Sequence, residues 1–414
     1  MRVGIDANPL RSEHMTGIPV YIDALVRQFL ENPAHGLGPE HLLLVARVPV
    51  AHLRACLERH GVAWRDVSGL RIESDLYDVR LAPRFPGLAR PPLGWVTRKV
   101  DGRLLEPINR RLAARVRPTS PVDVFHWSGD GGRPHRVPGA RRNVLTIHDL
   151  TPRLFPETHD PHIVENFEHL CAFARNEADF LIADSEATRC DAIEHLGIAP
   201  DRIRAVPLAA RDALLQAVPD ETVRAVGAKF GLDDRRYVLA GGSLEPRKNL
   251  PRLIAAFALL AREPDMGDVR LVLAGARQRG AGAVEAAVSE HGLTDKVVLT
   301  GFVTDAELAA LMRGAACFAY VSLYEGFGLP VLEAMAQGPP VVTSKVSSLP
   351  EVAGDAALLV DPYEPESIAD GMRRVLTVAN LAASLREKGA ARAGTFSWER
   401  TAAEHVRVYR EVAG

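Results

Sequence analysis

The residues best suited to chemistry lie in the segment S-L-Y-E-G-F-G-L-P-V-L-E, residues 322–333. Glu325 follows an apolar run, the next residues G-F-G predict a tight turn, and Pro330 suits the first turn of a helix, where its missing N–H costs little. Glu333 then lies about one turn into that helix. Two carboxylates beside the free N–H groups of a helix start can bind a polyhydroxylated ligand and orient a pyrophosphate. Ordinary surface glutamates are the alternative, and the turn between the two argues against it.

Two adjacent cations lie in a second segment, G-G-S-L-E-P-R-K-N-L, residues 241–250. Its glycines allow the backbone to approach a ligand closely. Where no metal ion is present, fixed cations such as Arg247 and Lys248 must stabilise the negative charge that builds up as a diphosphate leaves. The alternative is an ordinary basic helix start, but cations sit poorly at the positive end of a helix unless an anion joins them.

Two weaker signals lie in the first half of the chain. His148, in L-T-I-H-D-L, comes directly after an apolar run, at the edge of a sheet where ligands usually bind. A lone histidine is more often structural, so its assignment depends on the other motifs. Thr16 and Gly17 lie between a predicted strand and a predicted helix, where a backbone N–H could contact a phosphate.

The elements that must position these segments predict an α/β fold in two domains. Apolar runs predict strands in the first half at 2–5, 41–48, 122–126, 143–147 and 180–183. Helical patterns separate several of them, and the alternation restarts at 237–241 and continues to 357–360. Buried strands that alternate with helices predict parallel sheets covered on both faces. We expect two doubly wound, Rossmann-like domains, joined by an exposed connection at 198–218.

Composition excludes several classes of protein. The 414 residues exceed what one core usually holds, 47% of them are hydrophobic, and the net charge of -2 argues against a dedicated nucleic-acid binder. The four cysteines form no C-x-x-C pair and have no histidine at metal-ligand spacing, as expected of reduced thiols in the cytosol. The first residues do not resemble a signal peptide, and no apolar run approaches the roughly 20 residues of a spanning helix. These features predict a cytoplasmic protein.

Basic residues are concentrated at 80–117, where only Asp101 and Glu106 oppose ten arginines and lysines. One interpretation is a contact with the acceptor or with an anionic membrane surface, because clustered basic residues are attracted to a negative leaflet. The other is a solvated surface insertion.

The motifs and their order resemble the retaining GT-B glycosyltransferases of family 4, and within them the mannosyltransferase-B-like branch. The resemblance covers nearly the whole chain. It rests on I-D-A-N-P-L, T-I-H-D-L-T-P, A-D-S-E-A-T, L-E-P-R-K-N, G-F-V, E-G-F-G-L-P-V-L-E and S-S-L-P-E-V-A-G-D-A-A-L-L-V-D-P. These motifs are specific for the GT-B fold, with its two domains facing a cleft, and for the type of reaction. They are much less specific for the sugar.

The resemblance implies a role for each motif residue. Arg247 and Lys248 would hold the diphosphate of the donor, and Glu325 would bind the hydroxyls of its hexose. The backbone would complete the hexose site at Phe327, Gly328 and Leu329. Catalysis would rest on His148, Arg247, Lys248 and Glu325.

Four further contacts to the donor are implied. Glu333 would bind the ribose hydroxyls, and the backbone of Val303, in G-F-V, would meet the nucleobase. From the first domain, Gly17 would approach the phosphates and His148 would contact the hexose.

The chain departs from the pattern in two loops. Many relatives have G-R-L where this chain has G-S-L at 242–244, so the donor-binding positions Gly242 and Ser243 supply no arginine. The charge of the phosphates must then rest on Arg247 and Lys248. The loop at Gly17 also has one glycine where many relatives have two.

The resemblance also implies domain boundaries and candidate substrates. Residues 1–205 would form the acceptor-side domain, 206–394 the donor domain, and 395–414 a helix that crosses back to the first domain. We expect transfer of a hexose with retention of configuration, with no metal ion and no cofactor beyond the nucleotide-diphosphate sugar. GDP-mannose is the best candidate donor. UDP-glucose, UDP-N-acetylglucosamine and dTDP-rhamnose stay open, and the acceptor is a glycan, a lipid-linked or a small molecule.

Other functions are compatible with the same fold. A sugar-nucleotide epimerase would convert the donor without an acceptor. A phosphorylase of the pyridoxal type would show the visible absorbance of its cofactor, and a non-catalytic binder would neither hydrolyse nor transfer the sugar. The intact set of Arg247, Lys248 and Glu325 argues against the last.

Overall fold

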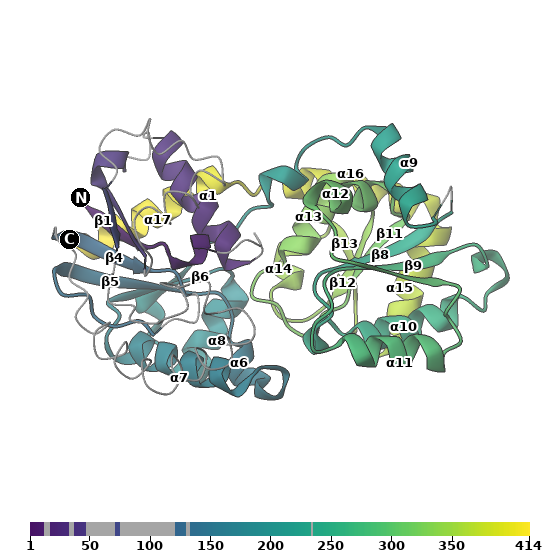
Figure 1. Cartoon of the computed structure of the whole chain (residues 1–414), viewed down its shortest axis with the longest axis horizontal. Helices are drawn as coiled ribbons and strands as arrows, with labels where there is room; N and C mark the ends of the chain where they lie inside the picture. Colours follow the sequence, from purple (N-terminus) through teal and green to yellow (C-terminus); the bar gives the residue numbers. More distant parts are fainter. Residues whose placement is uncertain (12–16, 33–36, 47–70, 75–120, 130–132, 233–234) are drawn as a thin grey trace, which may run out of the picture.

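The computed structural model describes residues 1–11, 17–32, 37–46, 71–74, 121–129, 133–232 and 235–414. Its strands form two separate parallel sheets, each covered by helices and lying in its own half of the molecule (Figure 1). The basic segment 80–117 lies outside the described residues. Within the described part of the chain, no helix combines the length and the apolar character needed to cross a bilayer.

The first sheet has the strand order β3-β2-β1-β4-β5-β6-β7. Its strands are β1 (Val3–Asp6), β2 (Leu42–Ala46), β3 (Arg71–Ser74), β4 (Val122–Trp127), β5 (Ala140–Ile147), β6 (Phe180–Ala183) and β7 (Ile203–Ala205). The helices of this half are α1 (Ile18–Glu31), α6 (Thr151–Leu154), α7 (Pro161–Asn176) and α8 (Glu186–Leu196).

The second sheet has the order β10-β9-β8-β11-β12-β13. Its strands are β8 (Tyr237–Gly241), β9 (Arg270–Ala274), β10 (Val297–Gly301), β11 (Cys317–Tyr320), β12 (Val341–Ser344) and β13 (Ala357–Val360). Its helices are α9 (Asp220–Lys229), α10 (Leu250–Leu260), α11 (Ala281–Glu290), α12 (Asp305–Gly314), α13 (Leu329–Gln337), α14 (Leu349–Ala353), α15 (Pro365–Thr377) and α16 (Ala379–Ala393). Every residue of β8, β11 and β12 is buried, which explains the apolar sequences of β8 and β11 and the apolar first half of β12.

Both sheets have a point at which the strand order reverses. In the first sheet it lies between β1 and β4, and in the second between β8 and β11. In open parallel sheets, ligands bind in the crevice beyond the carboxyl ends of the strands at such a point. The loops after β8 and β11 carry the two strongest sequence motifs, so the fold brings these motifs to one place.

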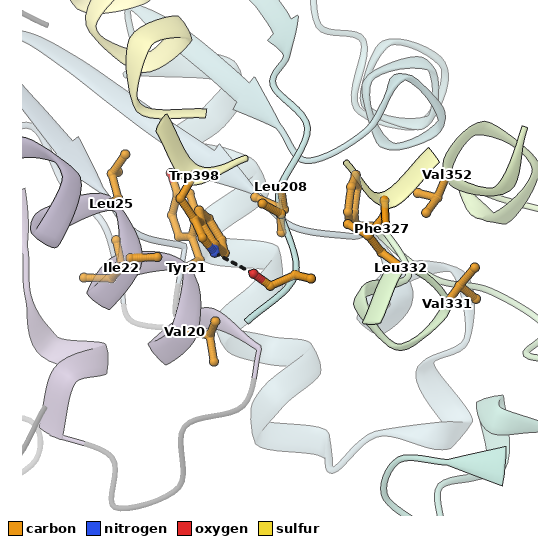
Figure 2. Close-up of a cluster of buried hydrophobic side chains, with 14 of the residues drawn as sticks. Val20, Tyr21, Ile22, Leu25, Leu208, Phe327, Val331, Leu332, Val352 and Trp398 are labelled. Carbon is orange, nitrogen blue, oxygen red and sulfur yellow. Dashed lines mark hydrogen bonds between the residues drawn. The ribbon is translucent and has the colours of Figure 1, made fainter. Parts of the chain in front are cut away.

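The last helix, α17 (Trp398–Ala413), packs on α1, β4 and β5 of the first half, where Figure 1 shows it in yellow among purple elements. Trp398 at its start donates a hydrogen bond of 3.0 Å from Nε1 to the carbonyl oxygen of Ala210 (Figure 2). The indole ring lies in one hydrophobic cluster with Tyr21 of α1, Leu208 of the connection and Phe327 of the second half. The cluster therefore ties both halves to the chain between them.

The prediction of an exposed connection at 198–218 is wrong in its centre. Ile203–Ala205 form the edge strand β7, and Val206, Leu208 and Ala210 after it are 0%, 5% and 3% exposed. The apolar side chains of this stretch other than Pro207 are buried because they fill the space beside α17, and the local sequence does not indicate this contact.

Candidate active site

Three of the predicted site residues meet in one cluster at the switch point of the second sheet. Arg247 and Lys248 come from the turn after β8, and Glu325 from the turn after β11. Arg247 donates from Nη1 to Glu325 Oε2 at 2.7 Å, and Lys248 donates from Nζ to Glu325 Oε1 at 2.7 Å. Glu325 thus lies between the two cations.

A tyrosine that sequence reading missed belongs to the same cluster. The hydroxyl of Tyr320 donates to Glu325 Oε1 at 2.9 Å and accepts a hydrogen bond from Lys248 Nζ. Tyr320 ends β11 and lies five residues before Glu325. Its place at the carboxyl end of a buried strand was the signal that could have indicated it.

Burial and pairing set the charges of the cluster. Burial alone would raise the pKa of Glu325, but the charges of Arg247 and Lys248 outweigh it and lower the pKa to about 2. Burial and the neighbouring Arg247 lower the pKa of Lys248, which Glu325 only partly restores. Glu245 also pairs with Arg247, at 3.1 Å from Nε to Oε2. Two cations therefore face two carboxylates.

The carboxylate of Glu325 already accepts nearly as many hydrogen bonds as it can. A carboxylate offers about four acceptor positions. In this site Lys248 and Tyr320 take two positions on Oε1, and Arg247 takes one on Oε2. Counting the partners among the described residues, one position on Oε2 is left, which suits a single hydroxyl group.

The turn around Glu325 is held by two serines of the loop before α14. Ser347 donates to the Glu325 carbonyl and accepts from its backbone N–H at 3.1 Å. Ser348 donates to the carbonyl oxygens of Glu325 at 2.9 Å and Phe327 at 2.7 Å. Gly328 is the N-cap residue of α13 and has a φ of 108°, and a Cβ atom there would lie 2.7 Å from Leu349, so glycine is needed at this position. Leu329 is the first residue of α13.

The glycine loop after β8 carries Gly242 and Ser243 beside the cluster. Gly242 has a φ of 113°, and a Cβ atom there would lie 3.7 Å from Cε of Lys248. Its carbonyl oxygen would lie only 2.0 Å from a Cβ atom on Gly275 of the neighbouring loop after β9. The backbone of this loop is therefore packed closely against Lys248 and its neighbouring loop.

The two halves of the molecule meet at the turn after β11. A Cβ atom on Gly326 would lie 1.9 Å from the carbonyl oxygen of His148, so only glycine allows this approach. The carbonyl oxygen of Gly326 accepts hydrogen bonds from Ser185 Oγ at 2.6 Å and Thr188 Oγ1 at 3.1 Å, at the start of α8. The carboxyl ends of β5, β6 and β11 thus face one another.

A second contact between the halves caps α8. The carboxylate of Glu351 in α14 accepts hydrogen bonds from the backbone N–H of Glu186 at 2.9 and 3.0 Å and of Ala187 at 3.3 Å. These N–H groups at a helix start have no partner within the helix. Tyr324 adds a hydrogen bond to Asp191 of α8.

His148 lies beside this contact, with both ring nitrogens in hydrogen bonds. Nδ1 lies 2.7 Å from Oδ2 of Asp184, and Nε2 lies 2.7 Å from the carbonyl oxygen of Ser128. Burial alone would lower the pKa of His148, but Asp184 and the Ser128 carbonyl raise it above its ordinary value. Sequence reading identified His148 but missed Asp184, the aspartate of A-D-S-E-A-T.

Glu333 lies apart from the Arg247–Lys248–Glu325 cluster and has a different cation as its partner. Its carboxylate is 1% exposed and is held by Arg211, from Nε to Oε1 at 2.6 Å and from Nη2 to Oε2 at 2.9 Å. Arg211 also donates to Asp305 Oδ1 at 2.6 Å. Asp305 starts α12, two residues after Val303, which is half-buried. Arg211 was not identified from the sequence because nothing near it in the chain indicates its partners.

The remaining predicted contact is Gly17, which lies in the first half at the start of α1. It is exposed, has a φ of 61°, and provides no side-chain cap for the helix. Its neighbour Thr16 lies outside the described residues. Among the residues that the structure describes, no three His, Cys, Asp or Glu side chains are arranged to hold a metal ion.

Comparison with known proteins identifies the family of the chain. A model of the family described as "Glycosyl transferases group 1" matches residues 226–392. O-antigen chain mannosyltransferase B of Escherichia coli is 31% identical over 384 residues, which cover 92% of this chain and 97% of that protein. The serotype-specific mannosyltransferase WbdA of Escherichia coli is 32% identical over 268 residues, which cover 63% of this chain and 32% of that protein.

Solved structures share the fold over the whole chain. HepE of Anabaena, solved with UDP and glucose, aligns with a TM-score of 0.68 at 18% identity. The alignment covers 99% of this chain and 100% of the HepE chain. WaaG, a glycosyltransferase involved in lipopolysaccharide biosynthesis, has a TM-score of 0.62 at 16% identity and covers 99% of each chain. With these similarities, the chain belongs to the group 1 glycosyl transferases, adopts the GT-B fold and is a hexosyltransferase.

Proposed function

We propose that this protein transfers mannose from GDP-mannose to a glycan, a lipid-linked or a small-molecule acceptor, with retention of configuration. The observation that carries this proposal is the buried cluster of Arg247, Lys248 and Glu325 at the switch point of the second sheet. The names of the similar E. coli proteins, both mannosyltransferases, support the choice of sugar.

The reaction follows from the charges in the cluster. When the bond from the sugar to the diphosphate breaks, negative charge grows on the departing phosphate. Arg247 and Lys248 are already held in place by Glu325, so they need little reorganisation to stabilise that charge. No metal ion is required for this step. One hydroxyl of the hexose would take the last acceptor position on Glu325 Oε2.

Retention is proposed to occur by attack on the same face as the leaving group. The departing phosphate would take the proton of the acceptor hydroxyl. A covalent route would need a carboxylate nucleophile below the anomeric carbon. Glu325 is a poor candidate, because three hydrogen bonds and a pKa of about 2 hold its carboxylate as a weak base.

The other contacts keep the roles that the resemblance implies. Glu333 would bind the ribose, the backbone of Val303 the nucleobase, and Gly242 and Ser243 the phosphates. The backbone of 327–329 would complete the hexose site. Gly17 and His148 would close the site from the first domain, which would also take the acceptor. The cytoplasmic location and a membrane contact through 80–117 stay predictions.

The test is a panel of nucleotide sugars offered to the purified protein. GDP-mannose, UDP-glucose, UDP-N-acetylglucosamine and dTDP-rhamnose are compared by thermal stabilisation, since a bound ligand raises apparent stability according to its affinity. We expect GDP-mannose to stabilise most and to be consumed in the presence of a glycan acceptor. NMR of the product should show the anomeric configuration of the donor. Preference for another donor would refute the mannose assignment, and conversion of the donor without an acceptor would indicate an epimerase.

A further inference from the structure

His148 directly follows β5 and is enclosed by two groups that come from β4 and β6, the strands on either side of β5. Asp184 directly follows β6 and reaches Nδ1, whereas the carbonyl oxygen of Ser128, after β4, reaches Nε2, both at 2.7 Å. A carbonyl oxygen only accepts, so the proton between it and Nε2 must belong to the histidine. Nε2 is therefore a donor in every state that keeps this geometry.

The Ser128 carbonyl thus requires the proton on Nε2, and Asp184 decides whether the ring carries a second proton on Nδ1. A neutral imidazole carries one N–H, and the position of that proton depends on the hydrogen bond that the other nitrogen makes. With Asp184 at Nδ1, the ring either carries protons on both nitrogens beside an ionised carboxylate, or carries one on Nε2 and accepts a hydrogen bond at Nδ1 from the protonated carboxyl group. In both cases Nε2 keeps its proton. Asp184 is 4% exposed, and its other oxygen, Oδ1, is buried without a hydrogen-bond partner among the described residues. Among the described residues, the hydrogen bond to His148 is therefore the only one that offsets the cost of burying this carboxylate.

The loop that presents the Ser128 carbonyl is itself held in place. Ser128 donates from Oγ to Asp6 Oδ2 at 2.7 Å. Gly129 follows with a φ of 76°, and a Cβ atom there would lie 2.3 Å from the carbonyl oxygen of Thr146 and 3.2 Å from Cδ2 of His148. The ends of three strands, β1, β4 and β5, thus contribute to the orientation of one ring.

Other titratable groups surround the ring without competing for its nitrogens. The ring of Tyr21 in α1 meets it edge-on, with centroids 5.1 Å apart. The neutral forms of the histidines in β4 and α17 are favoured, because burial lowers the pKa of His126 well below its ordinary value and that of His405 to about 4. Asp149 adds a weaker attraction for the charged form of His148.

We propose that Asp184 is a positioning residue for sugar transfer, which holds His148 with its Nε2 proton ready for an oxygen of the donor. This inference rests on the proposed function, because it is the donor that would replace the Ser128 carbonyl at Nε2. His148 adjoins the hexose site, since its own carbonyl oxygen lies against Gly326, next to Glu325. The exchange replaces one acceptor by another and moves no proton to the substrate.

The first measurement is the titration of His148, which is monitored by NMR of protein labelled with ¹⁵N at histidine. The signal is assigned by its loss in His148→Asn. In the native chain we expect Nε2 to stay protonated from pH 5 to 8. In Asp184→Asn, which keeps the shape of the side chain but removes the charge, the pKa of His148 should fall by about one unit or more. Asp184→Glu keeps the charge and should restore part of the shift, which guards against a variant that is merely misfolded.

The matched control is Asp179→Asn at the other end of β6. Asp179 accepts from the backbone N–H of Asn143 at 2.8 Å and pairs with Arg142. Its loss should lower stability and leave the titration of His148 unchanged.

The second measurement is a double-variant cycle on kcat/KM for GDP-mannose. Asp184→Asn should lower it about 10- to 100-fold, the range that a hydrogen bond to a charged group spans. The alkaline limb of the pH profile should also move to lower pH, because the charged imidazolium, which is the stronger hydrogen-bond donor, loses its Nδ1 proton at lower pH. In a His148→Asn background, Asp184→Asn should have almost no further effect, since both changes remove one interaction.

The proposal is overturned if the titration of His148 is the same in Asp184→Asn, or if the losses of the two variants multiply in the cycle. If the native protein transfers no sugar, the proposed reaction is refuted. If Asp184→Asn then still shifts the titration of His148 and weakens the binding of nucleotide sugars, the positioning role of Asp184 in binding is supported.

Discussion

Arg211 holds both carboxylate oxygens of Glu333, although the two residues lie 122 positions apart in the chain. Arg211 belongs to the connection between the two halves, and Glu333 to α13 of the second half. Since Arg211 also pairs with Asp305 at the start of α12, one guanidinium joins the connection to two elements of the proposed nucleotide site.

Replacing Arg211 should destabilise the fold. Arg211→Ala leaves the 1% exposed carboxylate of Glu333 without its cation, and removal of one partner from a buried pair costs about 3 kcal/mol or more. Urea unfolding measures the change. Arg236→Ala is the control, because its pair with Asp268 is exposed on both sides and contributes below about 1 kcal/mol. Equal losses in the two variants would contradict the importance of the Arg211 pair.

Replacing Glu333 should mainly weaken binding of the donor. Without its carboxylate the ribose hydroxyls lose an acceptor, so the Kd of the donor should rise about 10- to 100-fold in Glu333→Ala, while kcat at saturating donor changes much less. Calorimetry with GDP-mannose measures the Kd. Glu285→Ala, which removes a half-exposed carboxylate on α11, should leave it unchanged. An unaltered Kd in folded Glu333→Ala would refute the ribose assignment.

Acid should loosen the attachment of α17. His405 bonds to Tyr21 of α1 and to the Thr401 carbonyl, and burial lowers its pKa from 6.5 to about 4. Between these values the unfolded chain binds a proton that the folded chain does not, so stability must fall as the pH falls from 6.5 to 4.

The slope of that decline is the measurable quantity. Each such group contributes up to about 1.4 kcal/mol per pH unit to the free energy of unfolding. His405→Gln keeps a hydrogen-bonding side chain without the titration, so its decline should be shallower than in the native chain. Urea unfolding at pH 7, 6, 5 and 4 gives both slopes, and parallel slopes would contradict this account of His405.

The sequence was sufficient to predict the strands that are buried on both faces. The runs at 180–183 and 237–241 coincide with β6 and β8, because a short, uninterrupted apolar run between two helical patterns is typical of a strand in a parallel sheet. The cluster of Arg247, Lys248 and Glu325 was also within reach, since the loops after β8 and β11 adjoin the same switch point.

What sequence reading missed depends on contacts between distant parts of the chain. The motif A-D-S-E-A-T gave no role for Asp184, and Arg211 and Tyr320 lie outside the functional motifs. Each of the three acquires its role only through a partner brought to it by the fold. The strand β7 was missed because three residues beside a proline-containing connection carry too little periodicity to be recognised.

In the proposed reaction, the two cations bound to Glu325 stabilise the departing diphosphate. Lys248→Ala removes one of them, and Lys248 is buried in the cluster and donates to Glu325 and Tyr320. Steady-state transfer from GDP-mannose should give a kcat about 10²-fold below that of the native protein. Lys388→Ala, which removes an exposed lysine paired with Asp355, serves as the control with a normal rate. A folded Lys248→Ala variant with a nearly native kcat would contradict the account.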